Sequence, residues 1–477
     1  MIRDQTPRAG RGSSNTAPNS ETFRAVALSR LFWFAVAVST LTALYAALTA
    51  RGLVYDGSLY LLAIAATRTF HIVETARSSV QVFQQLPAVL GARLGIQNLW
   101  ILGKLFSLGM AGWPVALTAA CWLALPREEK SWIVGPMFNL VFAVPAASFI
   151  GISEGIIASC LLWLAVLLVM FRLARPFGAF AALAAVVACA LAHEAAVLCL
   201  LLIGWSAAAQ FSKLRGFPRL AAALVTIVSV AGACYMARWI LFPRSSIERA
   251  DFLASILGGF LGSPRTPNVP VLASLAAAIS IATAIVWRRK GLGTAIIGGT
   301  AILSCGIVFA AAPDALVSPG RFFAARGLPV ALTTLLTGLF VILQRLGTTP
   351  APFITRPAIY VVVTLAVSQA LMQVSATNIW RDYTHDLRLL VATRQGVISH
   401  KQALEALDGD ESRFRREMLQ TWSVQPLSIL LAPGGRVRAI VEPAETERWV
   451  PYHTTEPRKL PRMPQLDWSQ FPGLVAR

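Results

Sequence analysis

The chain has 477 residues, of which 56% are hydrophobic and only 14% are charged. A soluble globular domain carries about a quarter charged residues, so this composition excludes an ordinary soluble enzyme. The net charge of +19 lies mainly in short segments between apolar runs, which is typical of membrane proteins and not of a nucleic-acid-binding surface. We therefore expect an all-α polytopic membrane protein with membrane lipid, and no nucleic acid, as a partner.

The first thirty residues are predicted to form a disordered cytoplasmic N-terminus. Residues 1–24 are rich in Ser, Asn, Pro, Gly and Arg, a composition typical of disorder. Leu31 to Ala50 is apolar and long enough for a first span. Because more apolar runs follow it, we interpret this span as an uncleaved anchor and not as a signal peptide.

The first external segment, residues 51–98, carries Asp56 directly after the first span. A carboxylate fixed at the membrane boundary is a candidate general base. The alternative is that Asp56-Gly57 forms a tight turn in which Asp56 caps the next helix. Thr69 to Leu86 has helical spacing and a Glu74–Arg77 pair, which predicts a helix on the membrane surface that ends or breaks at Pro87.

Further apolar runs bring the predicted number of transmembrane helices to about eleven, with external loops at 243–269 and 313–327. The segments predicted to be cytoplasmic hold 17 Lys and Arg against four acids, a net 17 − 4 = +13, which is the positive-inside bias. An odd number of spans places the C-terminus outside. The remaining spans are Leu99–Leu125, two within Trp132–Met170 around Glu154, two within Phe177–Phe211 around His193-Glu194, Leu220–Phe242, Pro270–Trp287, Leu292–Ala312, Leu328–Leu343 and Ala358–Val374.

Residues 376–477 are soluble in composition and predict a small α+β extracytoplasmic domain with room for a protein partner. The pattern from Trp380 to Val391 indicates an amphipathic helix, and Ser399 with Gln402 fits a capping box. Apolar runs at 428–431 and 437–441 flank Pro433-Gly434-Gly435, which predicts a β-hairpin.

The candidate substrate-binding residues lie at or beyond the predicted outer boundary. They are Glu74, Glu154, His193, Glu194, Arg238, Arg321 and Arg326. Glu154 and Glu194 interrupt apolar runs, where a charge is costly and is usually functional or paired. The alternative is that both carboxylates cap helices, and that His193 is a hydrogen-bonded structural histidine. The arginines could bind a phosphate through two parallel hydrogen bonds or could extend to the interface.

This layout resembles the integral-membrane glycosyltransferases of the GT-C fold over residues 31–375. The features shared are an inside N-terminus, an external acid soon after the first span, surface helices in the first loop, about eleven spans and an external C-terminal domain. One departure is that Asp56 is followed by Gly57 and not by a second nearby acid.

The resemblance implies transfer of a sugar from a polyprenyl-phosphate-linked donor to a glycan or lipid acceptor at the outer face of a bacterial inner membrane. Asp56 would be the catalytic base, Arg321 or Arg326 would stabilise the departing phosphate, and Glu154, His193 and Glu194 would orient sugar hydroxyls. No metal site is predicted, although a divalent metal would be compatible. The alternatives are a transporter or flippase of a lipid-linked glycan, and a non-catalytic subunit of an envelope polysaccharide assembly complex.

Overall fold

The computed structural model describes residues 20–73, 75–144, 154–242, 262–263, 266–267, 319–347, 349–350, 356–407, 418–419, 423–443 and 466–469. This part of the chain is mostly helical, and its two sheets have two strands each. Within it, six helices are long and apolar enough to cross a membrane, and three shorter helices are apolar as well. The spans expected at 270–287 and 292–312 lie outside the described residues, as do Glu74 and most of the loop 243–269.

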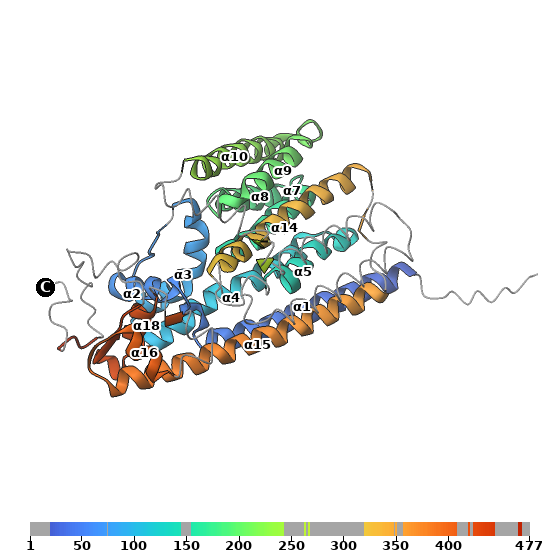
Figure 1. The fold of residues 1–477 in the computed structure, drawn as a ribbon. Coiled ribbons are helices and arrows are strands. Elements are labelled where there is room, and N and C mark those ends of the chain that lie inside the picture. The colour runs from blue at the N-terminus through green and yellow to red at the C-terminus, as the bar shows by residue number, and fades with distance from the viewer. Residues whose placement is uncertain are drawn as a thin grey trace, which may run out of the picture.

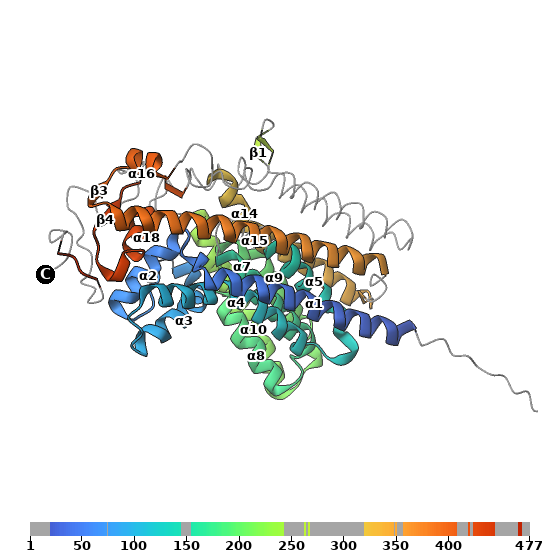
Figure 2. The ribbon, with the colours of Figure 1, turned by 90° about the horizontal axis from the view of Figure 1, so that it is seen from below.

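One hydrophobic core holds together a bundle of long apolar helices (Figure 1). Its central member is α7 (Glu154–Phe171), in which 89% of the residues of the apolar stretch are buried. The longest members, α1 (Ser20–Leu48) and α15 (Arg356–Thr393), lie side by side along one edge (Figures 1 and 2). The other members are α4 (Leu99–Ala124), η3 (Arg127–Ile133), α5 (Val134–Phe138), the π-helical η4 (Asn139–Ala143), α8 (Pro176–Cys189), η5 (Glu194–Ala196), α9 (Val197–Ala208), η6 (Phe211–Lys213), α10 (Gly216–Leu241) and α14 (Pro319–Arg345).

A second hydrophobic core forms what we call the end layer, at the end of the bundle opposite the start of α1 (Figure 1). It joins the segment after α1 to the C-terminal region, together with the first half of α4 and the second half of α15. The expected C-terminal domain therefore shares its core with the first external segment. The elements of the end layer are η1 (Arg51–Leu53), α2 (Asp56–Thr67), η2 (Thr75–Arg77), α3 (Ser78–Arg93), β3 (Gly396–Ile398), α16 (His400–Ala406), α18 (Val424–Leu430), η9 (Pro433–Gly435) and β4 (Ala439–Val441).

Several element boundaries differ from the sequence prediction. Helix α1 begins at Ser20, so residues 20–30 are helical and not disordered. Helix α14 begins at Pro319, so residues 319–327 are helical and not a loop. Helix α15 runs without interruption to Thr393, so the expected span and the expected amphipathic helix after it are one helix. At 38 residues it is about 57 Å long, nearly twice the thickness of a bilayer core of ~30 Å.

The surface helix predicted at 69–86 forms later in the chain, as α3, and Pro87 does not end it. A proline inside a helix leaves the carbonyl four residues earlier without its usual donor. Here that carbonyl belongs to Phe83, and the indole Nε1 of Trp113 donates to it at 2.7 Å. In Figure 1, α3 runs across the direction of α1 and α15, and it packs on α4, α7 and α8.

The hairpin predicted around Pro433-Gly434-Gly435 is also wrong. Residues 424–430 form α18, and β4 pairs in parallel with β3, with Val397 opposite Ile440. The capping box at Ser399 is confirmed, because its side chain accepts from the Gln402 N–H while the Gln402 side chain accepts from the Ser399 N–H. A short antiparallel pair, β1 (Gly262–Ser263) with β2 (Thr266–Pro267), stands apart from this sheet.

Candidate functional site

Asp56 is the first residue of α2 and is half-buried in the end layer. A carboxylate suits this position because the helix N-terminus carries partial positive charge. The helix cap itself is Tyr55, whose φ of 52° and ψ of −126° are unusual for a residue other than glycine. Gly57 permits a close approach, since a Cβ there would lie 1.8 Å from the Gly52 carbonyl oxygen. The pair Asp56-Gly57 thus begins a helix that is pressed against η1.

Tyr60 lies one turn after Asp56 and on the same face of α2, because residues four apart in a helix are neighbours. Its side chain is 5% exposed, and its hydroxyl lies 3.4 Å from Glu154 Oε1. The Gln81 amide donates both to the Tyr60 hydroxyl, at 3.3 Å, and to the same Glu154 oxygen, at 3.2 Å. The face of α2 that begins at Asp56 is therefore connected to the start of α7.

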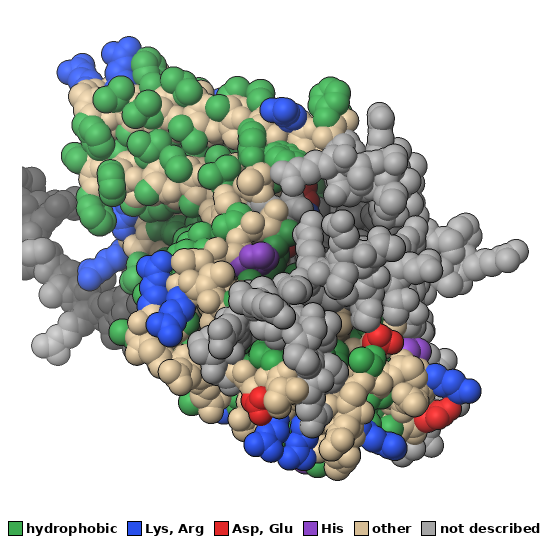
Figure 3. All heavy atoms as spheres, turned by 90° about the vertical axis from the view of Figure 1, so that its left-hand side faces the viewer, with side chains coloured by type: hydrophobic (Ala, Val, Ile, Leu, Met, Phe, Trp, Pro, Cys, Tyr) green, Lys and Arg blue, Asp and Glu red, His purple; other side chains and the backbone are tan. Residues whose placement is uncertain are grey.

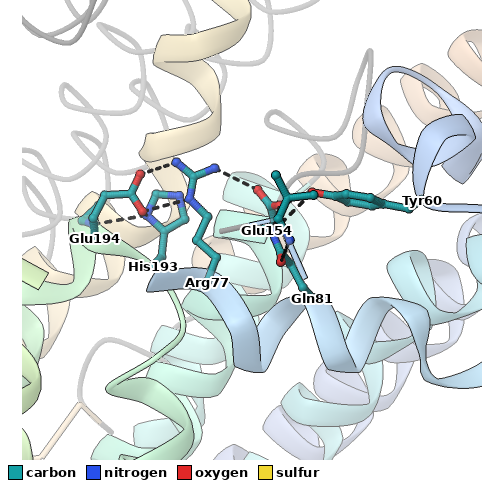
Figure 4. Close-up of polar contacts among 8 residues, drawn as sticks. Tyr60, Arg77, Gln81, Glu154, His193 and Glu194 are labelled. Atoms are coloured by element: carbon teal, nitrogen blue, oxygen red, sulfur yellow. Dashed lines mark hydrogen bonds and ion pairs between the residues drawn. The ribbon is translucent and has the colours of Figure 1, made fainter. Parts of the chain in front are cut away.

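Arg77 is the centre of the cluster (Figure 4). Its Nη1 donates to Glu154 Oε2 at 3.1 Å, and its Nε donates to Glu194 Oε2 at 2.9 Å. Its Nη2 donates to Glu194 Oε1, which makes the Glu194 pair two-pronged. Burial by itself would lower the pKa of Arg77, but the charges of Glu194 and Glu154 and their hydrogen bonds outweigh it and raise the pKa above its ordinary value.

His193 caps η5 and does not act as a cation in this cluster. Its Nδ1 accepts from the Ala195 N–H at 3.1 Å, which requires an unprotonated Nδ1. The same nitrogen lies 3.6 Å from Glu194 Oε2, a distance that would suit an ion pair only if Nδ1 carried a proton. The shorter contact has hydrogen-bond geometry, so we assign the neutral tautomer with its proton on Nε2. Among the residues that the structure describes, this cluster holds one arginine and two carboxylates.

Two glutamines of α3 hold the segment before η2 in place. Gln85 accepts from the His71 N–H and donates to the His71 carbonyl, both at 2.7 Å. Gln81 accepts from the Val73 N–H at 3.1 Å. The imidazole of His71 packs edge-on against the Tyr60 ring, with 5.9 Å between ring centroids. Gln81 and Gln85 are four residues apart on α3. Their amides hold the segment from His71 to Val73 in place, with His71 against the Tyr60 ring.

The structure brings together some of the predicted site residues and not others. Glu154 and Glu194 both pair with Arg77. Each is also the first residue of a helix, so each lies in a polar cluster and at a helix start at the same time. Arg238 is exposed near the end of α10, and it makes no ion pair with any described residue. Arg321 and Arg326 lie in the first turns of α14, whose start points toward the end layer (Figure 1). Glu74 lies outside the described residues.

Sequence reasoning missed Tyr60, Gln81 and Gln85, and it missed the contacts of Arg77 with Glu154 and Glu194. The overlooked pattern was Gln81 and Gln85, which lie four residues apart on α3 and are both buried. Buried amides are costly unless they are hydrogen-bonded, so two of them on one short helix indicate a polar network. Within the described ranges, no group of three or more His, Cys, Asp or Glu side chains could hold a metal ion.

Comparison of the chain with protein-family models, with curated proteins and with solved structures finds no match.

Proposed function

We propose that the protein is a membrane glycosyltransferase that moves a sugar from a polyprenyl-phosphate-linked donor to a glycan or lipid acceptor. The observation that carries the proposal is the meeting of α2, η2, α3, α7 and η5 in one polar cluster. This cluster lies where the apolar bundle meets the end layer. A lipid-linked sugar would present its reacting bond at this level, with its hydrocarbon chain in the bilayer.

In this mechanism Asp56 takes the proton of the acceptor hydroxyl. The acceptor oxygen then attacks the anomeric carbon of the donor sugar, and the bond from that carbon to the phosphate oxygen breaks. The electron pair leaves with the lipid phosphate, near which the first turns of α14 with Arg321 and Arg326 would lie. Glu154 and Glu194 are held by Arg77, which suits carboxylates that orient sugar hydroxyls and do not themselves transfer protons.

We further propose eleven spans in a bacterial inner membrane, with the N-terminus in the cytoplasm and the end layer outside. The basic residues support this orientation. Turns at the end opposite the end layer carry Arg127, Lys130, Arg172, Arg175, Lys213, Arg215 and Arg219, which is the charge bias expected of cytoplasmic loops. Figure 3 shows the opposite end, where apolar side chains cover the region of α8 to α10 and charged side chains gather over the C-terminal part.

The substitution Asp56→Asn tests the role of Asp56. Asn keeps the shape of the Asp56 side chain but cannot take a proton, and it lacks the negative charge that suits the start of α2. We expect release of polyprenyl phosphate from a panel of polyprenyl-phosphate sugars to fall by about 10²–10⁴-fold, while folding stability falls by no more than about 1 kcal/mol. The matched control is Asp382→Asn on α15, since the Asp382 side chain is 56% exposed. Full activity of Asp56→Asn would show that the assignment of the base is wrong, and no release by the wild-type protein from any donor would refute the function.

A further inference from the structure

A cavity of about 60 Å³ lies between α1, α4, η4, α7 and α15. Its polar lining comes from Ser39, Thr42, Arg51 and Gln373, and its other lining side chains are apolar. A buried site needs about 10–15 Å³ on this measure to hold one water. The cavity therefore has room for several waters or for one phosphate-sized group.

Arg51 is a cation fixed at one end of this cavity. It follows the last turn of α1, is 2% exposed, and its Nη1 donates to Gln373 Oε1 at 2.8 Å and to Thr377 Oγ1 at 3.0 Å. Burial lowers the pKa of Arg51 to about 10, so the guanidinium is still charged at neutral pH. These hydrogen bonds hold the charged guanidinium in one orientation, beside the cavity that it lines.

The remaining walls match the rest of an amphipathic ligand. The α1 side of the cavity is lined by Ser39, Thr42 and Ala43, which are half-buried, so this side is not closed off by the core. The α4, η4 and α7 sides are apolar. A phosphate joined to a hydrocarbon chain would meet a cation at one end and apolar walls along the other sides.

The cavity is also close to the polar cluster. Ile156 lines it and lies two residues after Glu154 in the first turns of α7. A phosphate beside Arg51 would place a group attached to it near the start of α7, where Glu154 meets Arg77. The cavity and the cluster thus both lie at the first turns of α7.

We propose that this cavity binds the phosphate of an anionic lipid through Arg51, and that the lipid is a polyprenyl phosphate. The inference rests on the proposed function, because the lipid would be the donor's carrier. An ordinary bilayer phospholipid has the same phosphate chemistry and is the competing source. This site is separate from Arg321 and Arg326 of α14, which the proposed mechanism places near the phosphate as it departs.

The test measures binding alone, with full-length protein in phosphatidylcholine nanodiscs. A polyprenyl monophosphate should bind at least about tenfold more tightly than the polyprenol of the same chain length. Ala43→Leu places extra carbons in the cavity without touching Arg51, and it should weaken binding by about tenfold or more. Ala37→Leu is the matched control, because Ala37 is exposed on the same helix. Arg51→Lys should also weaken binding, because Lys lacks the planar donor pattern.

Equal binding of the alcohol, or full binding by Ala43→Leu, would refute the site. Displacement of the polyprenyl phosphate by an equal concentration of phosphatidylglycerol would refute the assignment to the isoprenoid lipid. These outcomes are separate from a failure of the proposed function, since no sugar transfer is measured. A wild-type protein that binds the polyprenyl phosphate at this cavity but releases none from any sugar donor would refute the function and leave the site standing.

Discussion

Arg77 holds two carboxylates that come from distant parts of the chain. Glu154 and Glu194 are 77 and 117 residues further along, so the arginine ties η2 to both α7 and η5. The side chains of Arg77, Glu154 and Glu194 are 26%, 5% and 22% exposed. Removing the arginine would leave two shielded negative charges close to each other, which is more costly than losing a surface ion pair.

We predict that Arg77→Met destabilises the protein by about 3 kcal/mol, the lower end for a buried pair. The double variant Arg77→Met with Glu194→Gln should be less destabilised than Arg77→Met alone, because one stranded charge is gone. Thermal unfolding of the purified protein measures both. Arg381→Met is the control, since its pair with Asp382 is exposed and should be worth less than about 1 kcal/mol. A double variant as unstable as the sum of its two single variants would contradict this account.

His71 gives the end layer a dependence on pH. Burial lowers the pKa of His71 below its ordinary value of 6.5. Between these two values the unfolded chain binds more protons than the folded one, so stability rises with pH. The contribution of neutral His71 to folding stability is therefore fully present above about pH 6.5. It is lost as the pH falls toward the pKa of His71 in the folded protein.

We predict that His71→Gln reduces the fall in Tm between about pH 7.5 and about pH 5. The control is His385→Gln, because His385 is exposed on α15 and the substitution should leave the slope as in the wild type. An unchanged pH dependence in His71→Gln would show that other groups cause it.

At the scale of elements, α3 and α4 approach each other so closely that backbone meets backbone. A Cβ added at Gly109 would lie 2.1 Å from the Gln84 carbonyl oxygen. At Gly112, one turn later on the same helix, the nearest atom would be the Leu108 side chain at 3.6 Å, an ordinary contact. The Phe83 carbonyl, freed by Pro87, meets its Trp113 donor across this same contact.

We predict that Gly109→Ala separates α3 from α4 and lowers the thermal stability of the protein. Gly112→Ala should be neutral or stabilising, since alanine is favoured over glycine in a helix by about 1 kcal/mol. The two variants differ only in position, so the comparison isolates the close approach from helix propensity. Equal stability of the two would mean that α3 adjusts without cost.

The elements also show how far the sequence could be interpreted. Features decided by neighbours in the chain could be predicted, as with the capping box of Ser399 and the apolar runs that became α4, α7 and α10. Features decided by distant partners could not. Helix α3 continues past Pro87 because Trp113 donates a hydrogen bond to the Phe83 carbonyl. Strand β4 forms by pairing with β3, about forty residues earlier in the chain. The partners of Arg77 lie 77 and 117 residues further along the chain, so a sequence does not show them.

At the scale of the whole molecule, the orientation can be tested by labelling. Lys401 has an 86% exposed side chain in the end layer, and Arg175 is exposed at the opposite end of the bundle. We predict that Lys401→Cys reacts with a membrane-impermeant maleimide in intact spheroplasts, whereas Arg175→Cys reacts only after permeabilisation. The unmodified chain gives the background labelling of its native cysteines. The reverse pattern would invert the topology and place Asp56 on the cytoplasmic side.

The packing of α2 on α18 has a consequence for the order of events during synthesis. The Ser58 hydroxyl donates to the Ser423 carbonyl, 365 residues further along the chain. At about 5–20 residues per second, the ribosome needs roughly 20–70 s to cover that interval. Throughout that time α2 has no α18 to pack against. The face of α2 that packs on α18 therefore stays uncovered by the C-terminal region until synthesis of the chain is nearly complete.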